Sequence, residues 1–329
     1  MASAKPRHLR PTVTRLHKRT AAFARGFFTY LEGEGVRSAV LHGGENGFEE
    51  ELSDVDFAVS DIDFLRLPAL IQAYCAGRGW RLCQILRHET TASFFVCSAI
   101  DDPACAVALD ACSDYQRNGT LFMEAEELLA GRERLGWGGY RLATATELRY
   151  RFAKAAAKGK DTIACAAEFA RYPEECRAQC EMWLRDEWGH ALTSWDPAGV
   201  NAALTAFHSQ CNARPSIFSK AGIKRIFARI LEPTGLVVIA GTDQYGMTAT
   251  RLEEVFGHLY FRRCIRAPRW RILLFKDLVC TSMIILPEIG KMGTHLIPAR
   301  CLHRVDPIQE SSVQEQALAA FLHDRLTLS

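Results

Sequence analysis

The chain has 329 residues, of which 48% are hydrophobic and 24% charged; this composition excludes a disordered or fibrous chain and fits about two globular domains of ~150 residues each. Its 40 Lys and Arg nearly balance its 38 Asp and Glu, for a net charge of +2, which argues against a protein that binds nucleic acid over its whole surface. No apolar run reaches the ~18–20 residues of a membrane-spanning helix, so we expect a soluble chain with no transmembrane segment.

The first 26 residues are basic and contain no acidic residue. Such a segment is compatible with an organelle transit peptide or a nucleic-acid-binding arm. We favour a solvated basic face on a first helix over 13–35, because Phe23, Phe27 and Leu31 recur along one side of it. Gly33 and Gly35 then give the usual signal for a helix end.

Twelve cysteines are scattered along the chain without a Cys-x-x-Cys pair. A zinc site usually needs two close pairs of ligands, so this spacing disfavours one. With no signal peptide recognised, we expect reduced thiols in a cytoplasmic protein.

The apolar pattern predicts strands and helices along the rest of the chain. Strands are expected over 36–42, 55–59, 81–86, 92–99, 104–111 and 236–240. Helices are expected over 65–78, 124–131, 144–171, 174–188, 197–211, 215–231, 249–259 and 310–326. The run 236–240 (LVVIA) is continuously apolar, which is typical of a strand buried on both faces of a parallel sheet.

Three aspartates in the strand-rich part indicate a metal site. Asp54 and Asp56 share one face of an expected strand, and Asp110 lies in a later expected strand, 104–111. Carboxylates so arranged suit a pair of Mg²⁺ ions, and two metals ~3.5–4 Å apart stabilise both the attacking and the leaving oxygen of phosphoryl transfer. The alternative is a solvated acidic strand edge; the second Asp-x-Asp, Asp61 and Asp63, is interpreted as the N-terminal acids of a helix.

Gly43 and Gly44 precede the aspartate pair, and glycine leaves backbone N–H groups open to a triphosphate. The order Gly-Gly, loop, Ser53-Asp-x-Asp and a third Asp resembles the nucleotidyltransferase superfamily, which includes DNA polymerase beta and small antibiotic-modifying transferases. The resemblance implies that Asp54, Asp56 and Asp110 bind two Mg²⁺ (or Mn²⁺) ions. It also implies that Asp110 helps to activate the acceptor hydroxyl, and that Gly43, Gly44 and Ser53 hold the triphosphate of an NTP substrate.

Members of that superfamily often add a helical domain whose basic residues reach the nucleotide. Here Lys154 and Lys158 lie four residues apart in the stretch 150–160 (YRFAKAAAKGK), on one face of an expected helix. We expect them to contact the triphosphate; the alternative is an ordinary solvated lysine face.

Residues 235–248 (GLVVIAGTDQYGMT) have the strand, Gly-x-x-x-x-Gly and helix layout of a phosphate-binding loop, with Gly241 and Gly246 correctly spaced. The stretch resembles thymidylate-kinase-like domains, in which Asp243 matches but Gln244 and Met247 depart. Met247 occupies the lysine position and cannot neutralise phosphate charge. We interpret this part as a degenerate, shrunken phosphate-loop domain; a plain strand–turn–helix is the alternative.

We therefore expect an α/β chain with a small mixed-sheet nucleotidyltransferase domain (1–140), a helical extension (141–232) and a reduced phosphate-loop-like domain (233–329). This order resembles bacterial proteins associated with surface-polysaccharide synthesis. The expected activity is metal-dependent transfer of an NMP from an NTP to a hydroxyl or phosphate acceptor, with a sugar phosphate as one candidate acceptor. The main alternative is a non-catalytic scaffold or regulator of glycan assembly, and a small-molecule kinase is the least favoured.

Overall fold

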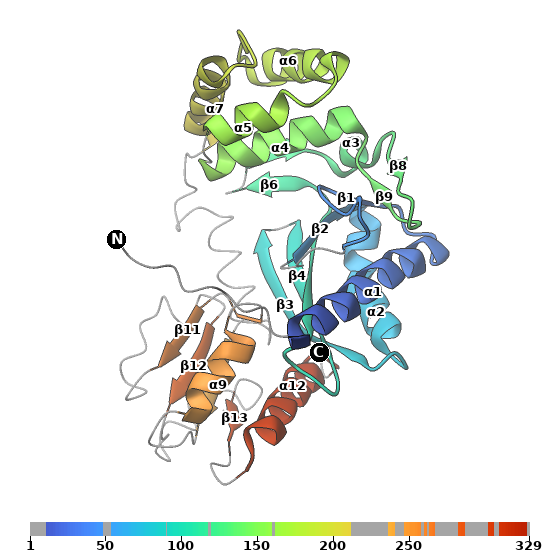
Figure 1. The fold of residues 1–329 in the computed structure, drawn as a ribbon, viewed down its shortest axis with the longest axis vertical. Coiled ribbons are helices and arrows are strands. Elements are labelled where there is room, and N and C mark those ends of the chain that lie inside the picture. Colours follow the sequence, from blue (N-terminus) through green and yellow to red (C-terminus); the bar gives the residue numbers. More distant parts are fainter. Residues whose placement is uncertain are drawn as a thin grey trace.

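The computed structural model describes residues 11–48, 54–89, 91–117, 120–159, 162–211, 236–240, 247–257, 260–261, 263–266, 282–286, 302–305 and 309–327. The chain is a mixed α/β protein (Figure 1). Ser53, residues 241–246 of the expected phosphate loop and the helix expected over 215–231 lie outside the described residues. Among the helices that are described, none is long and apolar enough to cross a membrane.

A mixed sheet of seven described strands forms the centre of the N-terminal part, in the order β3-β4-β5-β2-β1-β9-β8. Its strands are β1 (Ser38–Val40), β2 (Asp54–Val59), β3 (Trp80–Glu89), β4 (Ala92–Ala99), β5 (Ala106–Cys112), β8 (Glu133–Arg134) and β9 (Tyr140–Arg141). The central strands β2 and β5 run parallel, and β4 runs antiparallel to β5. A separate hairpin pairs β6 (Tyr115–Arg117) with β7 (Thr120–Met123).

Two helices, α1 (Pro11–Gly33) and α2 (Asp61–Cys75), cover one face of this sheet. The apolar side of α1 is buried there, as predicted, with Phe27 and Leu31 fully inaccessible. Helix α2 begins at Asp61 because the Ser60 hydroxyl accepts a hydrogen bond from the Asp63 N–H at 3.2 Å. The interpretation of Asp61 and Asp63 as N-terminal acids of a helix is therefore confirmed.

A cluster of helices packs at one end of the opposite sheet face. It contains α3 (Ala125–Leu129), α4 (Thr144–Lys158), α5 (Thr162–Phe169), α6 (Glu174–Trp188) and α7 (Pro197–Cys211). The expectation of one helix over 144–171 is wrong: Gly159 adopts a left-handed φ of 59° and its N–H bonds to Ala155 and Ala156 carbonyls, which ends α4.

The C-terminal part forms a parallel sheet in the described order β11-β12-β10-β13. Its elements are β10 (Leu236–Ala240), α9 (Met247–Phe256), β11 (Arg263–Arg266), β12 (Ser282–Leu286), β13 (Leu302–Arg304) and α12 (Ser311–Thr327). The buried parallel strand predicted over 236–240 is confirmed.

Helix α12 packs against β3 of the large sheet. The Arg325 guanidinium donates to the Gln84 side-chain oxygen at 2.7 Å, and the Gln84 amide donates to the Tyr260 carbonyl at 3.2 Å. Because Gln84 is fully buried, these C-terminal groups satisfy a polar side chain of the large sheet.

Two groups of elements cover the sheet face opposite α1 and α2: the helical cluster at one end and the C-terminal part at the other. Residues of β5 on this face contact both groups. Ala108 packs in the cluster formed with the C-terminal part, whereas Cys112 packs in the cluster formed with the helices. Asp110 lies between them on the same face, since strand side chains alternate. The predicted metal site therefore lies between the two groups.

Candidate metal and nucleotide site

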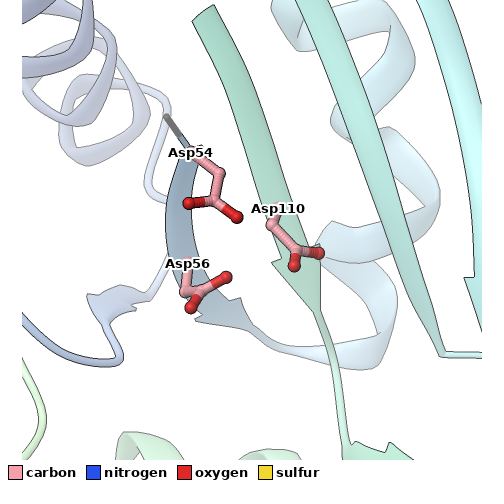
Figure 2. Close-up of side chains that lie close together, drawn as sticks. All are labelled: Asp54, Asp56 and Asp110. Atoms are coloured by element: carbon pink, nitrogen blue, oxygen red, sulfur yellow. The ribbon is translucent and has the colours of Figure 1, made fainter. Parts of the chain in front are cut away.

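The structure brings the three predicted aspartates together. Parallel pairing of β2 with β5 places Asp56 directly beside Asp110, and Asp54 lies two residues before Asp56 on the same face. One carboxylate oxygen from each of the three lies within 4.8 Å of the others. Figure 2 shows the three side chains close together, Asp54 and Asp56 on one strand and Asp110 on the neighbouring strand.

Asp56 is the most enclosed of the three, with 10% of its side chain exposed. Its Oδ2 atom lies 2.6 Å from His42 Nε2 and accepts a hydrogen bond from Lys154 Nζ. Burial favours the protonated carboxyl, but the hydrogen bond with His42 and the charge of Lys154 outweigh it and hold the pKa of Asp56 well below its usual range. Asp56 is therefore an anion bound by two side chains from distant parts of the chain.

Backbone pairing explains why His42 reaches Asp56. The Leu41 N–H donates to the Asp56 carbonyl at 2.9 Å, which extends the pairing of β1 with β2 up to the site. His42 follows immediately, and its ring stacks on Tyr150 at 6.1 Å between centroids. Its Nε2 atom also lies 2.7 Å from Lys154 Nζ. Because an imidazole nitrogen either donates or accepts, Nε2 makes one of its two contacts as a hydrogen bond at a time.

The next two residues form a turn that requires glycine. Gly43 and Gly44 have φ values of 71° and 86°, in the left-handed region. A Cβ on Gly44 would lie 3.1 Å from Phe48 Cε1, whereas a Cβ on Gly43 would meet nothing within 4 Å. The Trp137 indole donates to the Gly44 carbonyl at 2.6 Å and holds the turn in place.

Helix α4 positions the predicted lysines differently. Lys154 is 13% exposed and points to Asp56, with its ammonium 5.3 Å from the centre of the Tyr150 ring, one turn earlier. Lys158 lies in the last turn of α4 and is exposed. Of the two lysines, the structure brings Lys154 to the carboxylates.

A polar pocket opens beside Lys154, lined by His42, Arg151, Lys154, Ala155, Cys165, Glu168 and Phe169. The Arg151 guanidinium is fixed in it by an ion pair with Glu147 at 2.8 Å and by one with Glu168. The pocket therefore combines the Lys154 ammonium and the His42 imidazole, which both contact Asp56, with an Arg151 guanidinium held in place by two carboxylates. Such a set of donors is suited to an anionic ligand.

Sequence analysis did not identify three of these residues: His42, Arg151 and Trp137. The sequence signal for His42 is its position directly before the glycine pair. Arg151 lies in the same basic stretch, 150–160, as the two predicted lysines. Trp137 lies 93 residues from Gly44 in sequence, and no local pattern connects the two.

The three aspartates fit a divalent cation. They offer only carboxylate oxygens, the ligands that Mg²⁺ and Mn²⁺ prefer. Asp54, Asp56 and Asp110 would hold the ion or ions. Eight cysteines with described side chains are buried; for example, burial raises the pKa of the Cys112 thiol well above its ordinary value.

Comparisons with known proteins identify no close relative. No family model matches the chain, and no curated protein matches it. Among solved structures, the chain is similar to the antibiotic-resistance factor ANT(2'')-Ia, whose solution structure was analysed for substrate-regulated conformation dynamics. The two share 11% sequence identity over 59% of this chain and 94% of that one, with a TM-score of 0.31.

Proposed function

We propose that the chain is a metal-dependent nucleotidyltransferase that transfers an NMP from an NTP to a hydroxyl or phosphate acceptor. The observation that carries the proposal is the group of three carboxylates on paired parallel strands, next to a glycine turn and a pocket with cationic side chains. The acidic motif alone would not distinguish this from a metal-binding structural site. In addition to the acidic motif, the Lys154 ammonium and the Arg151 guanidinium that line the pocket support a phosphate-bearing substrate.

In the proposed reaction, an acceptor oxygen attacks the α-phosphorus. A new phosphorus–oxygen bond forms, the bond from the α-phosphorus to the bridging oxygen breaks, and pyrophosphate leaves. Asp110 takes the proton of an attacking hydroxyl, and a phosphate acceptor attacks without proton loss. Gly43, Gly44 and Ser53 hold the triphosphate, with Lys154 and Arg151 providing positive charge. Bound Mg²⁺ would supply further neutralisation of the charge that develops on the phosphates.

A sugar phosphate used in surface-polysaccharide synthesis is the acceptor that the sequence resemblance suggests. The structure adds one consideration, because Asp110 lies on the side of the site toward the C-terminal part. Asp54 pairs with Ala108, which packs against the same part, so the C-terminal part would border both the carboxylates and the acceptor. A non-catalytic scaffold would need none of these groups, so substrate binding separates the two alternatives.

Thermal stability with metal and nucleotide tests the proposed binding site. Mg²⁺ or Mn²⁺ together with one of the four NTPs is expected to raise the melting temperature of the wild-type chain, because a ligand that binds only the folded state stabilises it. Asp54→Asn is expected to abolish the increase. Asp61→Asn, which changes an exposed aspartate of the neighbouring helix, is the matched control and should retain it. An increase that survives Asp54→Asn, or its absence with all four NTPs, would contradict the proposal and favour the scaffold.

A further inference from the structure

The contact between Lys154 and Asp56 has a consequence for how ligands bind. Asp54, Asp56 and Asp110 place three carboxylates within 4.8 Å of one another, and like charges so close together repel. Asp56 is also nearly enclosed, and a buried carboxylate without a partner is costly. In the structure, the Lys154 ammonium contacts Asp56, the most enclosed of the three, directly.

Lys154 is itself enclosed, with 13% of its side chain exposed. If Lys154 moved away from Asp56 and found no new partner, the charge of its buried ammonium would be uncompensated. It lies in the polar pocket defined above, beside His42 and the fixed guanidinium of Arg151. The Glu168 carboxylate that lines the pocket is already paired with Arg151, so an anion that entered the pocket would provide a new partner for Lys154.

We propose that Lys154 is an exchangeable counter-ion of Asp56, which leaves the carboxylate when a divalent cation binds and pairs with the triphosphate instead. This inference rests on the proposed function and goes beyond it, because it assigns cooperative binding of metal and nucleotide to one side chain. The metal displaces Lys154 and makes it available to the triphosphate, and the triphosphate stabilises the displaced position. Each ligand therefore strengthens binding of the other by the same factor.

His42 makes this exchange feasible. Its Nε2 atom and Lys154 Nζ both contact the same oxygen, Oδ2 of Asp56. When Lys154 leaves, the imidazole N–H can still donate to that oxygen, so Asp56 keeps one hydrogen bond and its orientation. Tyr150 packs against both groups and, because burial raises its pKa well above the ordinary value, it remains a neutral support.

Mn²⁺ binding to the full chain in the absence of nucleotide tests the exchange, with the free ion followed by electron paramagnetic resonance. The wild type has to give up the Lys154–Asp56 pair, so it should bind Mn²⁺ weakly. Lys154→Met removes the competing cation and is expected to lower the Mn²⁺ dissociation constant about tenfold, within the ~5–150-fold range typical of coupling between ligands. Lys154→Arg keeps the charge and is expected to remain close to the wild type.

Two further variants make the result specific. Arg151→Gln removes a positive charge from the same pocket, but Arg151 pairs with Glu147 and Glu168 rather than with Asp56. The Arg151→Gln substitution is expected to change Mn²⁺ affinity by less than about threefold, because it alters only the screened electrostatic potential at the carboxylates. Asp110→Asn should weaken Mn²⁺ binding in every background. Melting curves establish that each variant is folded, and Lys154→Gln replaces Lys154→Met if that variant is not.

An unchanged or weaker Mn²⁺ affinity in both Lys154→Met and Lys154→Gln would overturn the proposal. An equal gain in Arg151→Gln would also overturn it, because the effect would then be a general change of charge. Pyrophosphate release by the wild type separates this failure from a failure of the proposed function. If release occurs but Lys154 does not affect Mn²⁺ binding, the transferase activity stands and the exchange is wrong.

Discussion

Gly43 and Gly44, next to the carboxylates, share a backbone conformation but differ in what an added side chain would contact. Both have a left-handed backbone conformation, which costs other L-residues ~1–2 kcal/mol. At Gly44 the cost has a second component, because a Cβ would lie 3.1 Å from Phe48 and 3.5 Å from Val40. At Gly43 there is open space, so that position tolerates a methyl group sterically but not conformationally.

Alanine substitution separates the two effects. We expect Gly44→Ala to lower the free energy of unfolding by about 2–3 kcal/mol, the sum of backbone strain and overpacking. Gly77→Ala is the matched control, since Gly77 has a φ of 74° and open space around it, and should cost only about 1 kcal/mol. Urea unfolding measures both. Equal losses in the two variants would show that Phe48 and Val40 do not restrict the turn.

The three aspartates were visible in the sequence because their spacing is a local property. Alternation along one strand fixes the common face of Asp54 and Asp56, and a separate apolar strand ends near Asp110. Their neighbours were not visible. The contact between Lys154 and Asp56 spans 98 positions, and the contact between His42 and Lys154 spans 112. Only the packing of α4 on one end of the sheet face brings these groups together.

At the level of elements, local signals explain which predictions succeeded. The helices expected over 174–188 and 197–211 have those bounds in the structure, and the apolar strand over 236–240 is β10. The break between α4 and α5 was missed because alanine-rich sequence continues across Gly159, and a single glycine is often tolerated within a helix. The short strands β6, β8 and β9 were missed because two to three residues carry no periodicity.

The C-terminal sheet has a pH-sensitive position at His303 in β13. This residue pairs with Ile239 of β10, and its ring lies 5.1 Å from that of Phe321 in α12. Burial lowers the pKa of His303 to about 4. The folded state therefore holds the neutral imidazole, whereas the unfolded chain takes up a proton near pH 6.5.

A lowered pKa in the folded state gives a stability contribution that is complete above pH 6.5 and is lost as the pH falls toward 4. We expect the wild type to lose up to ~3 kcal/mol of unfolding free energy over this interval through His303, at about 1.4 kcal/mol per pKa unit. His303→Gln removes this component, so its stability should change less between pH 7 and pH 4. Urea unfolding across that range measures the difference. Parallel pH profiles for the two proteins would contradict the assignment.

At the scale of the whole molecule, the site lies between the helical cluster and the C-terminal part, which pack on the same face of the large sheet. The helical cluster supplies Lys154, Arg151 and Tyr150, and the C-terminal part covers Cys83, Val96 and Ala108 of the same sheet. Arg325 and Tyr260 complete the hydrogen bonds of the buried Gln84. The C-terminal part thus supports the sheet that carries the carboxylates. Its division from the rest of the chain near residue 233 remains a prediction.

Pyrophosphate release is the most direct test of the transferase proposal. Purified full-length chain would be incubated with Mg²⁺, each of the four NTPs in turn and a pool of sugar phosphates. We expect release with at least one NTP that depends on the acceptor pool, falls at least ~100-fold in Asp110→Asn, and is retained in Asp61→Asn. Release that is equal in Asp110→Asn and the wild type, or no release under any combination while the chain is folded, would contradict a nucleotidyltransferase centred on Asp54, Asp56 and Asp110.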